Sequence, residues 1–323
     1  MVVGAAAGAV FGGAAGRSQP NNSKGELMRI VATGKAGQVV TALMERGAEL
    51  GVEVIPVGRP QLDLASPTPD FSAIRRARPH VIVSTAAYTA VDQAEGDLAA
   101  VEAINAIGPG RLAGVARELG IPIIHLSTDY VFDGGKTEPY REDDPTGPLG
   151  VYGKTKLNGE VAVAVATPNH VILRTAWVYS PFGSNFLKTM LRVAAERDEL
   201  RVVDDQHGNP TSALDVANAV IGVARNLVAR PRDTSLRGVF HMTGSGEASW
   251  ADFASEILEI SGRLGGPAAR VTRIRTADYP TPARRPMNSR LSNAKLQRVH
   301  GQVLPDWRTS TRIAVARLLN EPL

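Results

Sequence analysis

The stretch VATGKAGQVVTALMERG, residues 31–47, decides the fold. A short apolar run leads into a glycine-containing turn and then into an amphipathic segment, which predicts a strand, a tight turn and a helix. Gly34 and Gly37 keep two glycines of the G-x-x-G-x-x-G spacing, but Val40 stands at the third. Such a turn can hold a pyrophosphate on backbone N–H groups at a helix N-terminus. An ordinary strand–helix turn with glycines fits the same residues.

The missing third glycine bears on packing more than on phosphate contact. In dinucleotide-binding turns the third glycine lets helix and strand approach closely, while the first two shape the turn. We therefore expect Val40 to alter the packing and to leave an anion site at Gly34 and Gly37. Gln38 and Val39, which open the helix, are further candidates for cofactor contact.

Apolar runs alternate with amphipathic segments from Arg29 to Ser180. This alternation predicts β–α–β units and hence an α/β fold, a Rossmann-like doubly wound parallel sheet. Strands are expected at 29–33, 52–57, 79–87, 121–132 and 170–179, and helices at 38–50, 71–78, 98–120 and 151–165. Beyond Ser180 the alternation of strands and helices becomes less regular. Helices expected at 184–197, 211–229, 249–262 and 308–320 predict a smaller, mostly helical C-terminal substrate-binding region.

The same patterns divide the chain into three parts. Residues 1–27 are rich in Ala and Gly, with no Lys or Arg ahead of the run, which favours a disordered leader or a misassigned start. Residues 28–180 are the predicted dinucleotide-binding Rossmann domain. Residues 181–323 are mainly the substrate-binding region, with a part at about 207–245 returning to the Rossmann domain.

Composition narrows the function classes. The 323 residues carry a net charge of +4, and their Lys and Arg are scattered rather than grouped, which argues against a nucleic-acid partner. The apolar leader is too short and too weakly apolar to span a bilayer, so no membrane partner is expected. The absence of cysteine fits a cytoplasmic protein. The histidines are widely spaced, and no metal site is expected.

The end of the second strand bears on cofactor choice. Gly58 and Arg59 stand where an NAD-selective enzyme has an acidic residue for the ribose 2′-hydroxyl. A small residue followed by arginine can accept a 2′-phosphate, which favours NADPH, with NADH as the alternative. A surface arginine leaving a strand explains the pair equally well. Asp63 is a candidate neighbour of the adenine, or it only starts the next turn.

The segment VYGKTKLNGE places Tyr152 and Lys156 four residues apart, on one face of a predicted helix. A tyrosine with its ordinary pKa of about 10 is a poor acid or base near neutral pH, and a nearby ammonium lowers that pKa. Upstream, a strand ends in Ser127 and Thr128, whose hydroxyls can bind a carbonyl oxygen. A surface helix pair would explain Y-x-x-x-K alone, but not its order after the glycine turn and the S-T-D sequence.

Together these motifs resemble the extended short-chain dehydrogenase/reductases, and among them the dTDP-4-dehydrorhamnose reductase family. The resemblance runs from Met28 to the last predicted helix. It rests on GKAGQV, AAYTAVDQAE, STDYVFDG, PLGVYGKTKLNGE, RTAWVYS, NFLKTMLR, DDQHGNPTSA, YPTPARRPMNSRL and VLPDW, of which the last four are the most specific. The chain departs from the pattern at Val40, at Ser84 and Thr85, where an asparagine is more usual, and in its leader.

The resemblance implies reduction of the 4-keto group of dTDP-4-dehydro-β-L-rhamnose to dTDP-β-L-rhamnose, the last step of dTDP-L-rhamnose biosynthesis. Tyr152 would donate the proton, and Lys156 would lower the pKa of Tyr152 and bind the cofactor ribose. Thr128 would bond to the reacting oxygen or to Tyr152, tuning it, and Asp129 would hold a sugar hydroxyl. The implied cofactor residues are Gly34, Gly37, Gln38, Val39, Arg59, Asp63, Leu64, Ala86, Ala87, Tyr88, Tyr152 and Lys156. The implied substrate residues are Thr128, Asp129, Trp177, Asn185, Arg284, Arg285, Asn288 and Arg290.

Structural explanations compete with two of these assignments. Trp177 can close a strand into the core instead of lining a sugar pocket, and the arginines near Pro282 and Pro286 can form a solvated basic loop. A nucleotide sugar is the expected small-molecule partner, and a homodimer is compatible with the sequence. Two rival functions are a non-catalytic regulatory subunit, like the β subunit of methionine adenosyltransferase, and a sister sugar-nucleotide epimerase or dehydratase.

Overall fold

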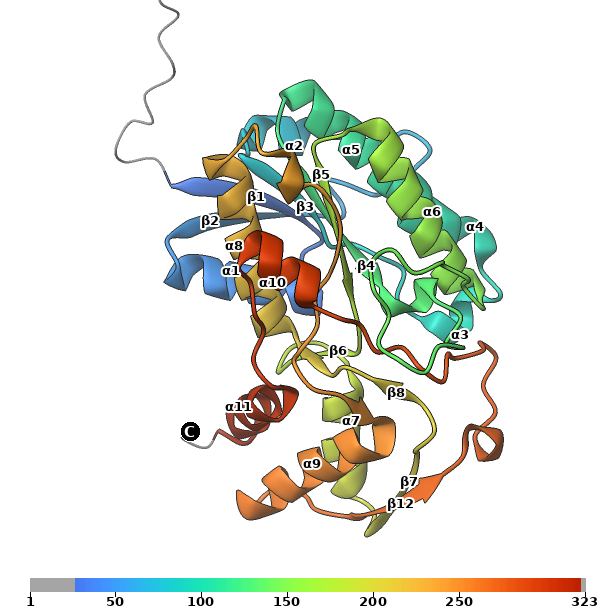
Figure 1. The fold of residues 1–323 in the computed structure, drawn as a ribbon. Helices are drawn as coiled ribbons and strands as arrows, with labels where there is room; N and C mark the ends of the chain where they lie inside the picture. The colour runs from blue at the N-terminus through green and yellow to red at the C-terminus, as the bar shows by residue number, and fades with distance from the viewer. Residues whose placement is uncertain (1–26, 321–323) are drawn as a thin grey trace, which may run out of the picture.

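The core of the protein is a six-stranded sheet in which neighbouring strands are parallel. The computed structural model describes residues 27–320, so the predicted leader, apart from Leu27, lies outside the described residues. The strand order is β2-β1-β3-β4-β5-β10 (Figure 1). The strands are β1 (Met28–Thr33), β2 (Val52–Val57), β3 (Val81–Ser84), β4 (Ile123–Thr128), β5 (His170–Thr175) and β10 (Gly238–His241).

Helices cover both faces of this sheet, because successive strand residues point to opposite faces. In β1, Ile30 and Ala32 pack into one hydrophobic cluster and Val31 into the other, and all three are fully buried. The first cluster lies under α1 (Gln38–Glu49), α8 (Ala213–Ala229) and α10 (Ala294–His300), and the second lies under α2 (Ser72–Ala77), α5 (Gly108–Leu119) and α6 (Val151–Ala166) (Figure 1). The predicted doubly wound α/β fold is confirmed.

The glycine turn between β1 and α1 has the predicted form. Gly34 has a φ of +100°, a left-handed conformation that favours glycine, and its N–H donates to Val57 O at 2.8 Å. Gly37 is the N-cap of α1 with an extended backbone. Val40 is 2 % exposed and packs in the cluster with the strand residues of β1. The third-glycine position therefore serves packing, as its place in the sequence predicts.

The sheet has one point where its winding reverses. β1 lies between β2 and β3, and the helices that follow β1 and β2 cover opposite faces. In open α/β sheets such a point leaves a crevice at the carboxyl ends of the strands, where ligands bind. The glycine turn and the residues after β3 stand at this crevice.

Most of the chain beyond Ser180 forms a second region past the carboxyl ends of the strands (Figure 1). It contains α7 (Phe186–Ala194), α9 (Trp250–Arg263) and α11 (Trp307–Leu319), around a core that includes Tyr179 and Phe253. α8 and β10 instead return to the main sheet. The short strands are β6 (Val178–Tyr179), β8 (His207–Gly208), β9 (Thr211–Ser212) and β11 (Ala248–Ser249), and the longer pair is β7 (Glu199–Val203) and β12 (Arg270–Ile274).

Several details differ from the sequence predictions: the strands expected at 79–87 and 121–132 are shorter, as β3 and β4, and α10 was not expected. The helix expected at 98–120 is α4 (Leu98–Glu102), a π-helical segment η1 (Ala103–Ile107) and then α5. The strand expected at 170–179 is broken before β6, because Trp177 adopts a φ of +46°. The strand pair β7 and β12 was not expected. The remaining short helices are α3 (Val91–Ala94), η2 (Asp129–Val131), η3 (Thr234–Leu236) and η4 (Thr276–Asp278).

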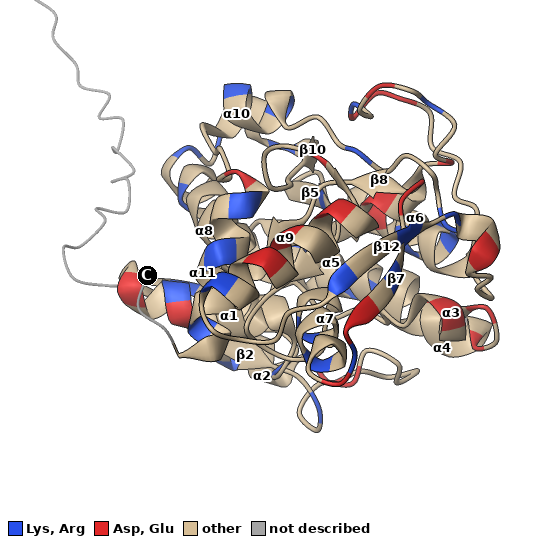
Figure 2. Ribbon diagram, turned by 90° about the horizontal axis from the view of Figure 1, so that it is seen from below, with Lys and Arg blue, Asp and Glu red and all other residues tan. Residues whose placement is uncertain are grey.

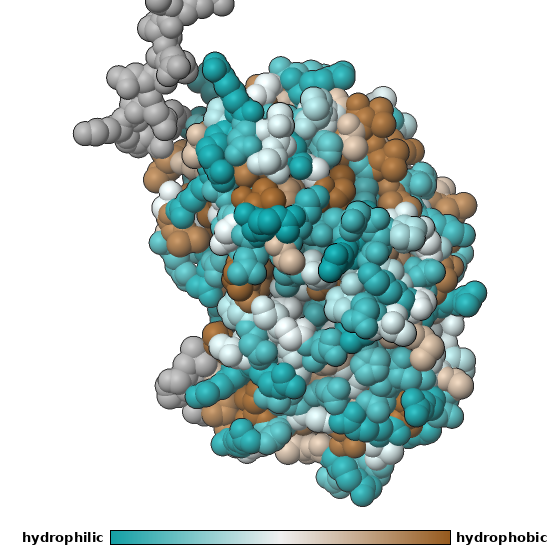
Figure 3. Space-filling view, viewed as in Figure 1, coloured by the Kyte–Doolittle hydropathy of each residue, from teal (hydrophilic) through white to brown (hydrophobic). Residues whose placement is uncertain are grey.

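Charges of both signs mix on the surface. In Figure 2 the basic residues of β12 lie beside acidic residues of β7 and its flank, in agreement with the ion pairs Arg270–Glu199 and Arg273–Asp204. Exposed apolar side chains include Val161 and Val165 of α6, at 57 % and 80 % exposure, and Figure 3 shows hydrophobic residues gathered over this edge of the molecule. Within residues 27–320, no helix has the length and apolarity that a membrane crossing requires.

Candidate active site

The start of helix α6 brings Tyr152 and Lys156 to the carboxyl end of β4. Gly153 allows the approach, since a Cβ at this position would lie 2.2 Å from Tyr130 O. The Tyr130 ring meets the Tyr152 ring edge-on, with 5.6 Å between centroids. Tyr152 is half-buried and Lys156 is 3 % exposed. The predicted pair therefore lies on one helix face against the strand that carries Thr128 and Asp129.

Thr128 and Asp129 form a buried polar pair beside Tyr152. Thr128 Oγ1 donates to Asp129 Oδ1 at 2.9 Å and accepts from Tyr130 N at 3.2 Å. Burial raises the pKa of Asp129 to about 6, and the hydroxyls of Ser289 and Thr128 offset only part of that rise. Asp129 Oδ2 has no hydrogen-bond partner among the described residues, which leaves an acceptor for a ligand hydroxyl.

The Tyr152 hydroxyl does not have the lowered pKa that the resemblance implies. Burial and the neighbouring Asp129 carboxylate raise the pKa of Tyr152 to about 12, and a hydrogen bond with Thr128 lowers it in part. Lys156 is not among the groups that shift this pKa, and its Nζ donates to Leu126 O at 2.6 Å. Tyr152 is consequently protonated at neutral pH, the form that a proton donor requires.

The Lys156 ammonium is itself perturbed. Burial lowers the pKa of Lys156 to about 8, and the nearby Glu160 carboxylate opposes this shift. Besides Leu126 O, Nζ lies 3.4 Å from Nε2 of His125. A lysine with a pKa near 8 changes its charge within the pH range where most enzymes are assayed.

A buried ion pair lies one helical turn beyond Lys156. Arg174 of β5 donates from Nε to Glu160 Oε1 at 2.9 Å and from Nη2 to Oε2 at 2.7 Å. Ser127 Oγ donates to the same Oε1 at 2.5 Å. Both charged side chains are 5 % exposed. This bidentate pair connects α6 with β4 and β5 directly behind the catalytic candidates.

The turn that would hold a dinucleotide is narrow. A Cβ on Gly58 would lie 3.1 Å from Gly34 Cα, so the glycine at 58 lets the backbones at the ends of β2 and β1 approach closely. Arg59 follows with an exposed side chain. Asp63 Oδ1 accepts from Ala65 N at 3.0 Å, and Leu64 is buried in the cluster under α5. Asp63 thus shapes a turn, in agreement with the alternative that it only starts the next turn.

The segment Ala86–Ala87–Tyr88 is fixed on both sides. Thr33 Oγ1 accepts from Thr85 N and Ala86 N, each at 3.0 Å. Asn105, fully buried in the π-helical segment, accepts from Tyr88 N at 2.8 Å and donates to Tyr88 O at 3.2 Å. Asn105 was not expected from the sequence, because nothing in a helical pattern marks the extra residue of a π turn.

Trp177 lies against a second tryptophan. Its ring is stacked on that of Trp250, with 3.6 Å between centroids and 7° between planes. A Cβ on Gly208 would lie 2.5 Å from the Trp177 ring, so this glycine accommodates the stack. Trp177 is half-buried at the end of β5. This placement suits a wall between the sheet and the C-terminal region.

The side-chain amide of Asn185 forms hydrogen bonds with other residues of the protein. Its Nδ2 donates to Gln38 Oε1 at 2.9 Å and to Ser180 O at 2.8 Å, and its Oδ1 accepts from Lys188 N as the cap of α7. These hydrogen bonds hold the amide in place, and its expected contact with the diphosphate stays a prediction. Gln38 takes part in the same joint between α1 and the C-terminal region.

Asn288 and Arg290 are likewise engaged. Asn288 Nδ2 donates to Lys136 O at 2.7 Å and to Glu138 O at 3.0 Å, and its Oδ1 accepts from Arg290 Nε at 2.8 Å. Arg290 also forms an ion pair with Glu247 and donates to Thr137 O. These two side chains fasten the 281–290 loop, and their expected contact with the diphosphate stays a prediction.

The remaining arginines of the loop are Arg284 and Arg285. Arg284 is exposed. Arg285 donates from Nη2 to Asp92 Oδ2 at 2.7 Å, while its buried Nη1 has no partner in the part of the chain that the structure describes. Asp92 also accepts from Ala283 N at 3.1 Å. The sequence analysis missed Asp92, which fixes the loop to α3.

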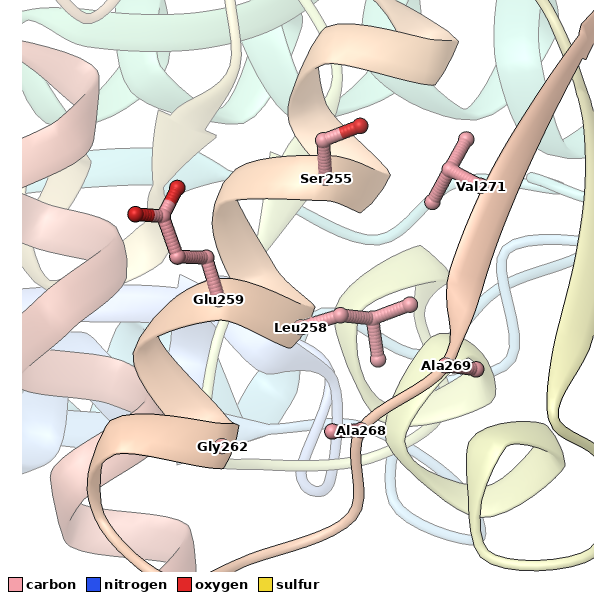
Figure 4. A pocket seen from close by; sticks show the side chains of 7 residues that line it. All are labelled: Ser255, Leu258, Glu259, Gly262, Ala268, Ala269 and Val271. Carbon is pink, nitrogen blue, oxygen red and sulfur yellow. The ribbon is translucent and has the colours of Figure 1, made fainter.

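Two other features of the described residues bear on the location of the site. The described residues hold no cluster of three or more His, Asp or Glu side chains that suits a metal ion. An open depression of about 450 Å³ lies between α9 and β12, lined by residues such as Leu258 and Val271 (Figure 4). It contains none of the residues predicted to bind cofactor or substrate.

A tyrosine–lysine pair beside a strand-end threonine, at the reversal point of a doubly wound sheet with a glycine turn, defines an extended short-chain dehydrogenase/reductase. Residues 28–320 match the RmlD substrate binding domain family. The chain is 53 % identical over 294 residues to the dTDP-4-dehydrorhamnose reductase of Sinorhizobium fredii NGR234, covering 91 % of this chain and 99 % of that protein. The chain belongs to the dTDP-4-dehydrorhamnose reductase family.

Further relatives agree. The dTDP-4-dehydrorhamnose reductase of Escherichia coli K12 is 42 % identical over 299 residues, covering 91 % of this chain and 98 % of that one. The crystal structure of the Clostridium acetobutylicum reductase superposes with a TM-score of 0.82 at 38 % identity, covering 90 % and 100 % of the two chains. The Bacillus anthracis reductase, solved in complex with NADP, has a TM-score of 0.81 at 31 % identity and the same coverage.

Proposed function

We propose that this protein reduces the 4-keto group of dTDP-4-dehydro-β-L-rhamnose to give dTDP-β-L-rhamnose, the last step of dTDP-L-rhamnose biosynthesis, with NADPH as reductant. The observation that carries the proposal is the protonated Tyr152 beside Lys156, Thr128 and Asp129 at the cofactor crevice. The family membership and the NADP complex of the Bacillus anthracis relative support it.

The turn between β1 and α1 fits a dinucleotide, because Gly34 has the left-handed φ of +100° that a tight turn requires and Gly37 opens the helix N-terminus. The bound nicotinamide would supply the hydride. In this mechanism Tyr152 donates its proton to the carbonyl oxygen of the sugar. Thr128 bonds to Tyr152 and orients it, and Asp129 Oδ2 accepts a hydrogen bond from a sugar hydroxyl. General acid catalysis of this kind contributes about 10²–10⁴-fold to a rate.

The remaining roles follow the positions of the side chains. Lys156 binds the ribose and balances the charge that Tyr152 gains after it loses its proton. The proposed cofactor residues are Gly34, Gly37, Gln38, Val39, Arg59, Asp63, Leu64, Ala86, Ala87, Tyr88, Tyr152 and Lys156. Trp177 lines the sugar pocket, and Arg284 and Arg285 bind the diphosphate, since guanidinium groups match phosphate oxygens. Asn185, Asn288 and Arg290 hold the loops of the pocket, and their contact with the diphosphate stays a prediction.

We assign residues 28–180 to dinucleotide binding and most of 181–323 to substrate binding, with α8 and β10 as the part that returns to the sheet. A homodimer in the cytoplasm completes the proposal. The exposed valines of α6 and the lack of cysteine support these two assignments. Size-exclusion chromatography with light scattering checks the dimer, and a monomer at micromolar concentration would remove it.

A coupled assay tests the function directly. The purified protein is given NADPH or NADH and the dTDP-4-keto-6-deoxy-L-sugar, and oxidation of the cofactor is followed at 340 nm, the wavelength of reduced nicotinamide. The expected result is one cofactor oxidised per sugar reduced. A tightly held NAD that is regenerated would instead indicate an epimerase or dehydratase. Dinucleotide binding without turnover, together with a stable partner protein, would indicate a regulatory subunit.

The exposed Arg59 predicts a preference for NADPH. We expect a higher kcat/KM with NADPH than with NADH, because the guanidinium can pair with the 2′-phosphate. Arg59→Ala should narrow the gap by roughly tenfold, the factor that about 1.4 kcal/mol represents. The exposed Arg232, outside the site, provides the matched control in Arg232→Ala. An unchanged ratio in the Arg59 variant would mean that another group reads the 2′-phosphate.

The lowered pKa of Lys156 predicts the alkaline limb of the pH profile. The ammonium form is present below about pH 8 and is lost as the pH rises through that value. We therefore expect kcat/KM for the sugar to fall above about pH 8, since the neutral amine no longer balances the charge that develops on Tyr152. Initial rates from pH 6 to 10 measure this. A profile that stays level to pH 10 would assign the charge balance to another residue.

A further inference from the structure

His125 lies buried beneath Lys156, and the mechanism above gives it no role. It sits in β4, fully inaccessible to solvent, between a residue of β3 and a residue of α6. Its Nδ1 is 3.1 Å from Ser84 Oγ, and its Nε2 is 3.4 Å from Lys156 Nζ. Three buried polar groups on three neighbouring elements thus form one chain that ends at the catalytic lysine.

The partners of His125 fix its tautomer. An ammonium group only donates hydrogen bonds, so Nε2 must be the unprotonated nitrogen that accepts from Lys156. Nδ1 then carries the hydrogen and donates to Ser84 Oγ. Burial and the neighbouring Lys156 charge lower the pKa of His125 well below its usual value, and the ring stays neutral. A hydrogen on Nε2 would place two donors face to face in a buried site.

The hydrogens of Lys156 can then be assigned. The ammonium has three, of which one goes to Leu126 O at 2.6 Å and one to His125 Nε2. Both acceptors belong to β4, on the sheet side of the lysine. Because the three N–H bonds are tetrahedrally arranged, two fixed partners leave the third hydrogen in one direction. That hydrogen is available to the Tyr152 hydroxyl or to a cofactor ribose.

We propose that His125 is a positioning residue for Lys156, which it orients through an Nε2 acceptor, and that Ser84 holds the His125 ring in place by accepting the Nδ1 hydrogen. The inference rests on the proposed function, in which Lys156 binds the cofactor and serves Tyr152. In this proposal His125 and Ser84 contact neither substrate nor cofactor. They act by setting the geometry of Lys156, which does.

Other charged groups also face Lys156, and their effects on its charge must be separated from the effect of His125 on its direction. Glu160 lies one turn further along α6 and favours the ammonium form, while Arg174 of β5 neutralises Glu160 from the far side. Tyr152 lies one turn earlier on α6. His125 is the neutral contact from β4, so its removal changes the direction of the ammonium more than its local charge.

Two substitutions of His125 separate its two contacts. His125→Gln places an amide oxygen near the position of Nε2 and keeps an acceptor for Lys156. His125→Asn places its amide near Nδ1, keeps the contact with Ser84 and loses the contact with Lys156. We expect His125→Asn to lower kcat about 10- to 100-fold and to weaken NADPH binding, as the loss of a hydrogen bond to a charged group implies. His125→Gln should recover most of both.

The control is a buried histidine elsewhere. His300→Asn truncates a ring that is 4 % exposed and contacts Phe240, outside the site. It should lower the melting temperature and leave NADPH affinity and the pH profile unchanged. His125→Asn should also move the alkaline limb of the pH profile, which a loss of stability alone would not do. Equal defects in the Asn and Gln variants, with an unshifted profile, would overturn the proposal.

One measurement does not depend on turnover. Nitrogen-15 NMR of the wild-type protein distinguishes the histidine tautomers, and comparison with His125→Gln assigns the His125 signals. A neutral ring with hydrogen on Nδ1 is expected, and hydrogen on Nε2 would overturn the proposal. If the wild type reduces no sugar, the proposed function fails, while NADPH titration and the tautomer still decide the role of His125.

Discussion

Tyr152→Phe should lower kcat for the sugar by about 10²–10⁴-fold and leave the dissociation constant of NADPH within about twofold of the wild type. The change removes one oxygen, that of the hydroxyl which the proposed mechanism uses as the proton donor next to Thr128 and Asp129. The ring remains, so its edge-on contact with Tyr130 is kept. Stopped-flow single turnovers measure the chemical step, and fluorescence titration measures the binding.

The same substitution at a remote tyrosine provides the control. Tyr279 is 61 % exposed, and Tyr279→Phe should leave kcat unchanged. Retention of more than about a tenth of the wild-type kcat by Tyr152→Phe would show that another group, or water, delivers the proton. A large loss of NADPH affinity would instead assign Tyr152 mainly to cofactor binding.

Glu160→Gln should cost about 3–5 kcal/mol in the free energy of unfolding, since it leaves the Arg174 guanidinium buried without its counter-charge. Arginine cannot relieve this by losing its proton. The substitution also removes the negative charge that raises the pKa of Lys156, so that pKa falls further below about 8. The alkaline limb of the activity profile should then move to lower pH. Urea unfolding measures the first effect, and initial rates measure the second.

An exposed pair on α9 provides the comparison. Glu259 and Arg263 are 57 % and 71 % exposed, and Glu259→Gln should cost less than about 0.5 kcal/mol. Replacing both buried partners by methionine should recover much of the loss, because no uncompensated charge remains. A cost below about 1 kcal/mol for Glu160→Gln would show that the pair does not hold α6 to the sheet.

The main elements could be predicted because their signals are local. The period of the apolar residues gives β1, β2 and α6 nearly to their ends, and the glycine spacing gives the turn at Gly34. The role of Val40 followed from knowing which glycine packs and which one turns. The π turn and the break before β6 escaped prediction. Both depend on tertiary contacts, such as the clamp of Asn105 on Tyr88.

The candidate site, like the fold, could be predicted only where its signals are local in sequence. The residue types and spacing of Tyr152 and Lys156 are visible in the chain, but the direction of the Lys156 ammonium depends on β4 and β3, which lie far away in sequence. Amides and guanidinium groups are ambiguous before folding, because they suit a ligand and a neighbouring loop equally well. Asn185 and Arg290 proved to bind loops for this reason.

Some of the missed residues did leave a trace. Arg174 interrupts the apolar strand VILRT, and a charge inside a buried strand requires a partner. Glu160 stands four residues after Lys156, on the same helix face, where that partner could have been sought. His125 interrupts the buried strand of β4 in the same way. Polar residues inside predicted core strands are therefore the signal that could have extended the site.

The close approach of Gly58 to Gly34 limits how this protein can change its coenzyme. Any side chain at 58 would meet backbone at 3.1 Å, closer than the 3.5–4.0 Å at which carbon atoms ordinarily rest. The acidic residue by which NAD-selective enzymes grip the ribose cannot be introduced at 58 without displacing the phosphate turn itself. A change of coenzyme preference towards NADH must therefore come from substitutions at Arg59 or beyond it, and Gly34 and Gly58 must both be kept.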